Sequence, residues 1–261
     1  MILVTREDNM QLMSRYPDRY FDLAIVDPPY GVLNKTARGG DKKFNKDEYS
    51  KWDVKPDDSY FEELFRVSKN QIIWGGNYFG QLWQRSPYNK GYVIWDKNQP
   101  EALNNFSMAE MAWTSFDKPS KIFHFSVRKN KNKIHPTQKP VELYEWLLKM
   151  YAQPGDRILD THLGSGTIAV ACYRAGLSLT ACEMSEEYFE KSCGYILQHV
   201  PRSSVEMHTD AYTCVLPKQF ERTSPLYAAY MEQEAQLSLF EEERSRMYNE
   251  GKDTALTGMT K

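Results

Sequence analysis

Short apolar runs alternate with longer amphipathic segments along roughly the first 200 residues of the chain. The apolar runs are rich in β-branched residues and predict strands over 2–5, 23–26, 71–74, 92–95, 108–114, 157–159 and 179–182. The amphipathic segments have helical spacing and predict helices over 9–16, 57–67, 77–84, 140–151, 166–176 and 185–199. Strands and helices in this alternating order predict an α/β fold, with a mostly parallel sheet and helices on both of its faces.

One pair of predicted strands departs from this alternation. Residues 92–95 and 108–114 have no helical pattern between them. A parallel connection usually contains a helix, so we expect these two strands to form an antiparallel hairpin at one edge of the sheet.

Two segments carry no periodic pattern. Residues 31–52 are polar and contain glycines, which is typical of a long functional loop. Residues 218–261 carry eight acidic and six basic residues but few core-type residues. We therefore expect one folded domain over 1–216, followed by a flexible C-terminal tail over 217–261.

The composition is ordinary for a globular protein and excludes several classes. Of the 261 residues, 41% are hydrophobic and 26% are charged. No apolar run is long enough to span a bilayer, and the first residues lack the pattern of a secretory signal. The four cysteines form no CxxC pair and lack the histidine spacing of a zinc site. We expect a cytoplasmic protein with reduced cysteines, no metal and no membrane association.

Basic residues gather in two segments although the net charge is only −2. Residues 118–139 contain seven basic residues and no acidic one, and residues 35–46 add five. Solvated loops and phosphate-binding loops account equally well for such charge runs. The candidate DNA-phosphate contacts are Lys35, Arg38, Lys42 and Lys43 in the first loop, and Lys121, Arg128, Lys129, Lys131 and Lys133 in the second.

The stretch FDLAIVDPPYG, residues 21–31, ends an apolar strand in an acid, two prolines and a tyrosine. Asp-Pro is a common turn opener, and proline does not continue a strand, so a simple turn is one interpretation. The other is a site that uses the Asp27 carboxylate, the Tyr30 ring and a backbone carbonyl whose direction Pro28 and Pro29 restrict.

A second informative stretch, residues 155–190, reads as strand, glycine-rich turn, helix, strand and acid. Gly164, Ser165 and Gly166 stand where a ligand could approach the backbone and the helix N-terminus closely, and Glu183 is placed to bind ribose hydroxyls. Asp160 precedes the turn. Its carboxylate would repel a pyrophosphate but attract a sulfonium or ammonium group, which favours S-adenosylmethionine over a nicotinamide dinucleotide.

Together, the Asp-Pro-Pro-Tyr motif and the glycine-rich turn resemble the S-adenosylmethionine-dependent DNA amino-methyltransferases. The catalytic motif comes first and the cofactor turn follows roughly 130 residues later, which resembles the circularly permuted order of the beta class of that family. The segments IIWGGNYF, MAEMAWTSF and IHPTQKPVELYEWLL also look like family segments, and the resemblance covers about residues 1–200. It implies a Rossmann-like class I methyltransferase fold in a protein of bacterial or phage origin.

The resemblance also implies roles for the catalytic motif. Asp27 and the Pro28 carbonyl would hold the N–H groups of an exocyclic amine, and Tyr30 would stack on a base flipped out of the duplex. In the family, an acid at the first motif position usually goes with adenine N6, and serine with cytosine N4. We therefore expect adenine-N6 methylation, with cytosine-N4 methylation as the alternative on the same fold. A non-catalytic DNA-binding or clamp-recruited module is the alternative from another class.

Three further residues enter as cofactor-site candidates through the resemblance. Thr137 and Lys139 would lie near the methionine end of S-adenosylmethionine. The family sheet would place the first strand of the chain third in its order, so Asp8 would approach the cofactor adenine or, equally, cap the helix beginning near Asn9. One departure is the run Asp160-Thr161-His162-Leu163, where many members have Asp-Pro-Phe, and the role of His162 is left open.

The expected macromolecular partner is double-stranded DNA. The target-recognition segment, about residues 117–134, is short, so either few bases are read per subunit or a homodimer or another element helps. In the tail, Gln236, Leu237, Leu239 and Phe240 belong to QLSLF, which looks like the peptide that docks on the bacterial sliding clamp. An amphipathic helix packed on the domain or on a second subunit is the alternative for this segment.

Overall fold

The structure is a computed structural model that describes residues 1–32, 52–85, 91–99, 107–127 and 133–209. All of these belong to the first of two units of the chain, Met1–Val215. The tail and most of the basic loop that follows the catalytic motif lie outside the described residues. The predicted domain boundary therefore stays a prediction.

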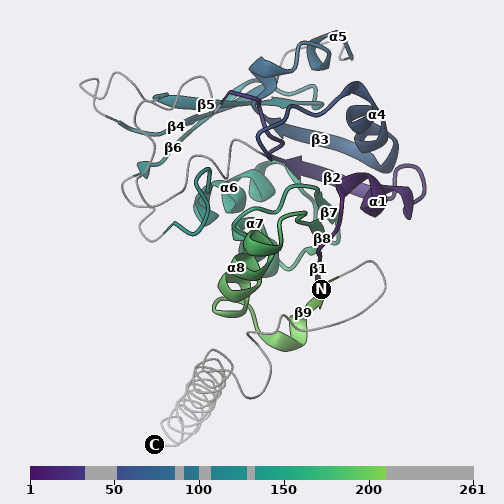
Figure 1. Ribbon diagram of the computed structural model, residues 1–261. Helices are drawn as coiled ribbons and strands as arrows, with labels where there is room; N and C mark the ends of the chain where they lie inside the picture. Colours follow the sequence, from purple (N-terminus) through teal and green to yellow (C-terminus); the bar gives the residue numbers. More distant parts are fainter. Residues whose placement is uncertain (33–51, 86–90, 100–106, 128–132, 210–261) are drawn as a thin grey trace, which may run out of the picture. The chain divides into compact units, whose positions relative to one another are not determined.

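Within the described residues, the strands form one sheet of nine strands in the order β6-β4-β5-β3-β2-β7-β8-β1-β9 (Figure 1). Their bounds are β1 (Ile2–Thr5), β2 (Phe21–Val26), β3 (Ser68–Trp74), β4 (Tyr92–Asp96), β5 (Ala109–Thr114), β6 (Lys121–His124), β7 (Arg157–Asp160), β8 (Ser178–Cys182) and β9 (Val205–His208). All seven predicted strands are present, and β6 and β9 are additional.

The sheet is mostly parallel, as predicted. β5 alone among the described strands runs antiparallel to its neighbours β3 and β4, so the predicted hairpin is confirmed. The hairpin is not the edge, however, because β6 pairs in parallel with the outer side of β4. β6 lies in the basic segment 118–139, whose charge pattern predicts a loop, and its Lys-Ile-Phe-His sequence is too short to stand out as a strand.

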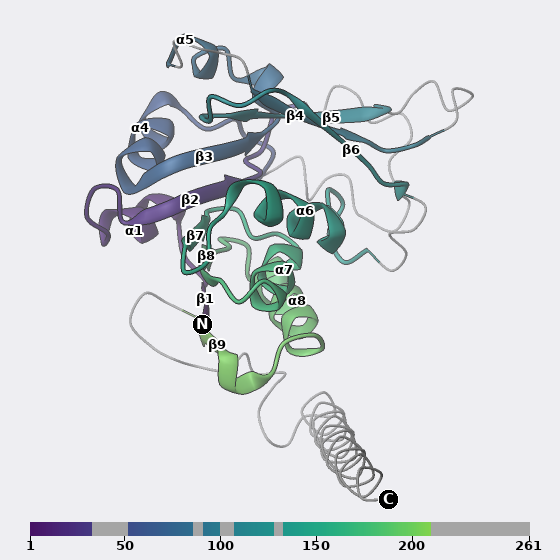
Figure 2. The same ribbon diagram turned by 180° about the vertical axis from the view of Figure 1, so that it is seen from behind.

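The helices are α1 (Asn9–Ser14), α4 (Asp58–Val67), α5 (Leu82–Arg85), α6 (Val141–Tyr151), α7 (Thr167–Arg174) and α8 (Glu186–Leu197), with short 3₁₀ turns η1 (Gly76–Tyr78) and η3 (Arg202–Ser204). α1 and α4 lie on one side of the sheet and α6, α7 and α8 on the other; Figure 2 gives the view from behind. Residues 23–26 of β2 are all buried, as expected for a central strand covered on both faces.

The predicted helix 77–84 is wrong as a single element. The chain forms η1, breaks around Gly80, and resumes as α5. Gly75, before η1, has φ +71°, a left-handed conformation that glycine adopts without strain. This irregular backbone follows directly from β3, beside the catalytic motif.

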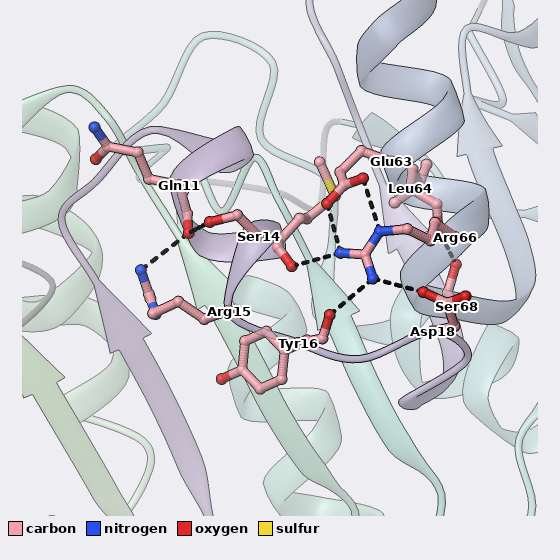
Figure 3. A network of polar contacts seen from close by, with 10 residues as sticks. Gln11, Ser14, Arg15, Tyr16, Asp18, Glu63, Leu64, Arg66 and Ser68 are labelled. Atoms are coloured by element: carbon pink, nitrogen blue, oxygen red, sulfur yellow. Dashed lines mark hydrogen bonds and ion pairs between the residues drawn. The ribbon is translucent and has the colours of Figure 1, made fainter.

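Arg66 of α4 ties that helix to the end of α1 and to the segment between α1 and β2 (Figure 3). Its guanidinium donates to the carbonyls of Met13 and Tyr16 at 3.2 and 2.9 Å. It also pairs with Asp18 at 2.9 Å and with Glu63 at 2.5 Å. Arg66 thereby fixes α4 against α1 and against the segment that leads into β2. β2 is the strand that carries the catalytic motif.

Candidate active site

The catalytic motif and the cofactor turn meet at a switch in the direction of the sheet. β2 and β7 are parallel neighbours, so their carboxyl ends lie at the same edge. From β2 the chain continues to β3 on one side, and from β7 it continues to β8 on the other. Open α/β sheets bind ligands at such a point. Asp27 follows β2 directly, and Asp160 ends β7.

Both carboxylate oxygens of Asp27 are engaged. The Tyr30 hydroxyl donates to Oδ1 at 2.5 Å, and the Lys139 ammonium forms an ion pair with Oδ2. Asp27 keeps 15% of its side-chain surface exposed, whereas Lys139 keeps 1%. A carboxylate has about four acceptor positions, so Asp27 retains the capacity to accept from a substrate amine.

Lys139 also contacts a second acid, Glu110 of β5, at 3.2 Å. The other oxygen of Glu110 pairs with Lys97 at 2.7 Å, and the Lys139 ammonium lies 5.1 Å from the centre of the Trp74 ring. Although burial opposes its ionisation, Glu110 is flanked by two lysines that lower its pKa to about 2. Burial raises the pKa of Asp27, with Glu110 adding to the effect and Lys139 opposing it.

The Tyr30 ring lies against the backbone after β3. It stacks on Tyr78 with ring centres 5.0 Å apart and an interplanar angle of 18°, and meets Phe79 edge-on at 6.1 Å. A Cβ on Gly75 would lie 2.1 Å from the Tyr30 ring, so the position admits only glycine. At Gly76, a Cβ would lie 2.7 Å from the backbone nitrogen of Trp113. The two glycines therefore let β5 and the Tyr30 ring approach this turn.

The glycine-rich turn after β7 has the geometry that the sequence predicted. Gly164 and Gly166 both have positive φ, +55° and +77°. The Gly164 N–H donates to Glu183 at 2.9 Å, and Gly166 lies so close to α8 that a Cβ would come within 2.9 Å of Ile196. Ser165 is buried, and its hydroxyl lies 3.4 Å from that of Thr167.

Two carboxylates flank this turn. Asp160 accepts the backbone N–H of His162 at 3.0 Å, and burial raises its pKa to about 8, with the charge of Asp27 adding to the shift. Burial also raises the pKa of Glu183, although the N–H groups of Gly164 and Ser185 oppose this. Among the described residues, neither carboxylate forms an ion pair. A cationic ligand would relieve the cost of burying these acids, whereas a pyrophosphate would increase it.

The remaining cofactor candidates have protein partners. Asp8 caps α1, accepting the Met10 N–H at 2.8 Å, so its capping role is confirmed and contact with an adenine stays a prediction. The Thr137 hydroxyl lies 3.1 Å from His135 Nδ1. The ammonium of Lys139 is directed at Asp27 and Glu110, which places this residue with the catalytic motif.

Aromatic side chains gather beside the turn. His135 meets Tyr188 of α8 edge-on at 4.3 Å and Trp52 at 5.5 Å, and a Cβ on Gly164 would contact the His135 ring at 3.6 Å. The segment 133–139 therefore packs onto the cofactor turn. Burial lowers the pKa of His135 to about 3, so the ring is neutral at physiological pH.

His162, whose role the sequence leaves open, has a hydrogen-bond partner at each ring nitrogen. Its Nε2 lies 3.1 Å from the Asn9 amide nitrogen and its Nδ1 lies 2.9 Å from the Thr161 hydroxyl. Thr161 in turn contacts the Tyr60 hydroxyl at 2.7 Å. Burial lowers the pKa of His162 to about 3. These contacts connect α1, the residues that follow β7, and α4.

The predicted DNA contacts are only partly described. Lys121 is exposed at the start of β6, on the outer edge of the sheet, and Lys133 precedes His135. The other seven, Lys35, Arg38, Lys42, Lys43, Arg128, Lys129 and Lys131, lie outside the described residues, as do Gln236, Leu237, Leu239 and Phe240. No helix in the described part is long and apolar enough to cross a membrane, and no group of His, Cys, Asp or Glu there is arranged to hold a metal.

Sequence reasoning missed Glu110, Lys97, Gly75 and Tyr78. Two of the segments singled out as family-like contain Glu110, Gly75 and Tyr78, but no role was assigned to them. The signal that was available is Glu110 itself, an acid between apolar residues of a predicted strand. Its pairing with Lys139 depends on contacts between distant segments, which no local pattern reports.

The fold and this site define a Rossmann-like methyltransferase. A family model described as DNA methylase, for amino groups at N6 or N4, matches residues 61–193, just over half of the chain. The chain belongs to this DNA methylase family.

Individual proteins are similar to this chain in sequence or in fold. The type II methyltransferase M.HpaI of Haemophilus parainfluenzae is 25% identical over 224 residues, 69% of this chain and 69% of that protein. A putative DNA modification methylase from Thermus thermophilus, solved with S-adenosyl-L-methionine, is 18% identical with a TM-score of 0.56 over 82% of this chain and 100% of that one. The cytosine-N4-specific PvuII DNA methyltransferase is 13% identical with a TM-score of 0.50, covering 72% of this chain and 84% of that one.

Proposed function

We propose that this protein transfers a methyl group from S-adenosylmethionine to the N6 amino group of an adenine flipped out of double-stranded DNA. The observation that carries the proposal is the arrangement at the switch point. Asp27 and Tyr30 follow β2, and the acidic, glycine-rich turn follows the neighbouring strand β7. A reactive amine at Asp27 and a methyl donor at the turn would then be brought together at one edge of the sheet.

The cofactor site suits S-adenosylmethionine, which supplies an electrophilic methyl group on a positively charged sulfur. Glu183 retains acceptor capacity for the ribose hydroxyls beside its bonds to Gly164 and Ser185. Asp160 provides negative charge for the cationic end of the molecule. Gly164, Ser165 and Gly166 bring backbone close to the ligand, and Thr137 and Asp8 remain candidates for its methionine and adenine ends.

At the catalytic motif, this chain's task is to hold an amine. The nitrogen of an exocyclic amino group is a poor nucleophile because its lone pair is delocalised into the base. Asp27 would accept one N–H, and the carbonyl of the buried residue Pro28 would accept the other, which favours a tetrahedral nitrogen. Pro29 has no N–H that could compete for Asp27, and the Tyr30 ring offers a surface for the base. The surplus proton then leaves the methylated nitrogen after transfer, to Asp27 or to water.

Cytosine-N4 methylation is the second candidate. The PvuII enzyme, named as cytosine-N4-specific, has a similar fold, so the fold by itself supports both bases. Asp27 at the first position of the motif favours adenine, since the family usually has serine there for cytosine. We therefore rank adenine first.

Further proposals concern partners and location. Lys121 and Lys133 are candidate phosphate contacts, together with the seven basic residues outside the described part of the chain. We also propose a cytoplasmic protein whose segment 236–240 docks on a bacterial sliding clamp, with a homodimer as an alternative use of the tail. A peptide of residues 230–245 that shows no clamp binding would overturn the docking proposal.

The function is tested by incubating the protein with radiolabelled S-adenosylmethionine and DNA of mixed sequence. The DNA is digested to nucleosides and the labelled base is identified; we expect N6-methyladenine. Asp27→Ala should abolish labelling while the cofactor still binds in calorimetry. Label on cytosine N4 would select the second candidate, and no label from a folded wild-type protein on any DNA would favour a non-catalytic binding module.

A further inference from the structure

Four alternating charges, here called the line, are joined by three consecutive ion pairs that begin at the catalytic motif. Asp27 pairs with Lys139, Lys139 with Glu110 at 3.2 Å, and Glu110 with Lys97 at 2.7 Å. They come from four separate segments: the turn after β2, the residue before the N-cap of α6, strand β5 and the residue after β4. Such a line over four segments forms only in the folded chain.

Lys139 is the buried centre of this line. Its side chain is 1% exposed and its ammonium lies over the Trp74 ring, so protein groups take the place of water. An ammonium so placed requires opposite charge, and removing one partner of a buried ion pair leaves an uncompensated charge. Asp27 and Glu110 supply that charge. Burial opposes protonation of Lys139, but the two carboxylates outweigh it and its pKa is raised.

We propose that Glu110 is a positioning residue for methyl transfer: it anchors Lys139, and Lys139 then holds the Asp27 carboxylate in the orientation that receives the substrate amine. This inference rests on the proposed function. Tyr30 bonds Oδ1 and Lys139 bonds Oδ2, so protein groups hold both oxygens of Asp27 while the carboxylate keeps acceptor capacity for a substrate amine. Glu110 shares the ammonium, so Lys139 orients Asp27 without fully neutralising it. Lys97 keeps Glu110 in place from the other side.

Several charged or titratable groups face Asp27 from the elements around it. These are Tyr30 in its own turn, Lys139 and Tyr144 at α6, Glu110 on β5, Tyr60 on α4 and Asp160 on β7. Of these, Glu110 and Lys139 are the charged groups that join the line. Removing the negative charge of Glu110 therefore lowers the pKa of Asp27. Removing Lys97 strengthens the pull of Glu110 on Lys139, draws the ammonium from Asp27 and raises the pKa of Asp27.

The test uses the full chain with S-adenosylmethionine and the DNA sequence that the wild type methylates, under single-turnover conditions with enzyme in excess. Glu110→Gln keeps the shape and an acceptor oxygen but removes the charge. We expect its single-turnover rate to fall about tenfold at pH 8, with the Kd for cofactor and for DNA within about twofold of wild type. The acid limb of its pH–rate profile should move to lower pH. In Lys97→Met, the acid limb should move to higher pH.

Glu145→Gln is the matched control. Glu145 lies on α6, pairs with Arg174 of α7 on the surface, and has no part in the line. Its substitution should leave the rate and the profile unchanged.

Opposite shifts in the two variants are a signature that a merely structural role would not produce. The inference is overturned if both variants fold, bind and keep the wild-type pH–rate profile. It is also overturned if the acid limb moves in the same direction in Glu110→Gln and in Lys97→Met. If Glu110→Gln does not fold, Lys97→Met decides alone, with an upward shift in support and an unchanged limb against. A folded wild type that methylates no DNA refutes the proposed function itself and, with it, this inference, so the two failures are distinct.

Discussion

The ring of Tyr30 lies directly on the backbone of Gly75: a Cβ added to Gly75 would stand 2.1 Å from Cε1 of the tyrosine. Tyr30 closes the catalytic motif, and Gly75 follows β3, the next strand of the sheet. Each residue therefore constrains the other. The tyrosine can stack on Tyr78 and reach Asp27 only because position 75 has no side chain.

Gly75→Ala should accordingly damage both stability and activity. The new Cβ overlaps the Tyr30 ring, and alanine is strained at φ +71°. Gly176→Ala is the matched control, because Gly176 has φ +69° with nothing within 4 Å of its added Cβ. We expect Gly75→Ala to lower the free energy of unfolding by about 1–3 kcal/mol more than the control, and to reduce methylation at least about tenfold. Equal losses of stability in the two variants, measured by urea denaturation, would contradict the close packing.

The hydroxyl and the ring of Tyr30 should have separable roles. Tyr30→Phe removes the hydrogen bond to Asp27 but keeps the stacked ring. Because that bond stabilises the ionised carboxylate, its loss raises the pKa of Asp27. We expect a rate lower by about tenfold and an acid limb at higher pH, consistent with about 1.5–3 kcal/mol for a hydrogen bond to a charged group.

Tyr30→Ala removes the ring as well, and this variant should no longer hold the target base in its extrahelical position. Fluorescence of 2-aminopurine at the target position measures this loss directly. If Tyr30→Phe and Tyr30→Ala give the same fluorescence with DNA, the ring has no part in holding the base.

Binding of S-adenosylmethionine should depend on pH through Asp160. In the protein alone, burial raises the pKa of Asp160 to about 8, so the group is largely protonated at pH 6. A cationic ligand needs the ionised form, and the affinity should therefore rise as pH increases towards about 8 and level off above it, with up to about tenfold per pH unit below it. Calorimetry should show proton release on binding near pH 7.

Two controls separate this effect from others. S-adenosylhomocysteine lacks the sulfonium charge, so its affinity should change less between pH 6 and pH 8. Asp160→Asn should bind S-adenosylmethionine more weakly at pH 8 and with a flat pH dependence. A steep dependence that persists in Asp160→Asn would assign the proton to another group, such as Glu183, whose pKa burial also raises.

Arg66 should contribute to stability far more than a comparable surface arginine. Its guanidinium joins two backbone carbonyls and two acids around α1 and α4 (Figure 3). Arg66→Met leaves those groups without their donor, and we expect a loss of about 1–3 kcal/mol in the free energy of unfolding. Arg85→Met is the control, because among the described residues Arg85 pairs with Glu62 at 3.8 Å and lies over the Phe65 ring, contacts that should change stability by under about 1 kcal/mol. Similar losses in the free energy of unfolding in both variants would contradict a special contribution of the Arg66 contacts to stability.

Much of the fold follows from local pattern. The seven predicted strands and five of the six predicted helices exist, because buried runs and amphipathic spacing are properties of neighbouring residues. The parts that failed have weak local signals. β6 is short and mostly exposed, and the predicted helix 77–84 breaks because Gly75 and Gly80 favour an irregular turn over continuous helix.

The sequence by itself determined the chemistry available at each end of the site: an acid, two prolines and a tyrosine after one strand, and glycines flanked by acids after another. These are short motifs whose residue types restrict the backbone directly. Only the tertiary structure decided that Lys139 belongs to Asp27, that Glu110 and Lys97 extend that pair, and that Gly75 supports Tyr30. Such contacts join segments far apart in the chain, and their energies depend on burial. The contacts and the burial both arise only when the strands assemble into the sheet, and the local sequence predicts neither of them.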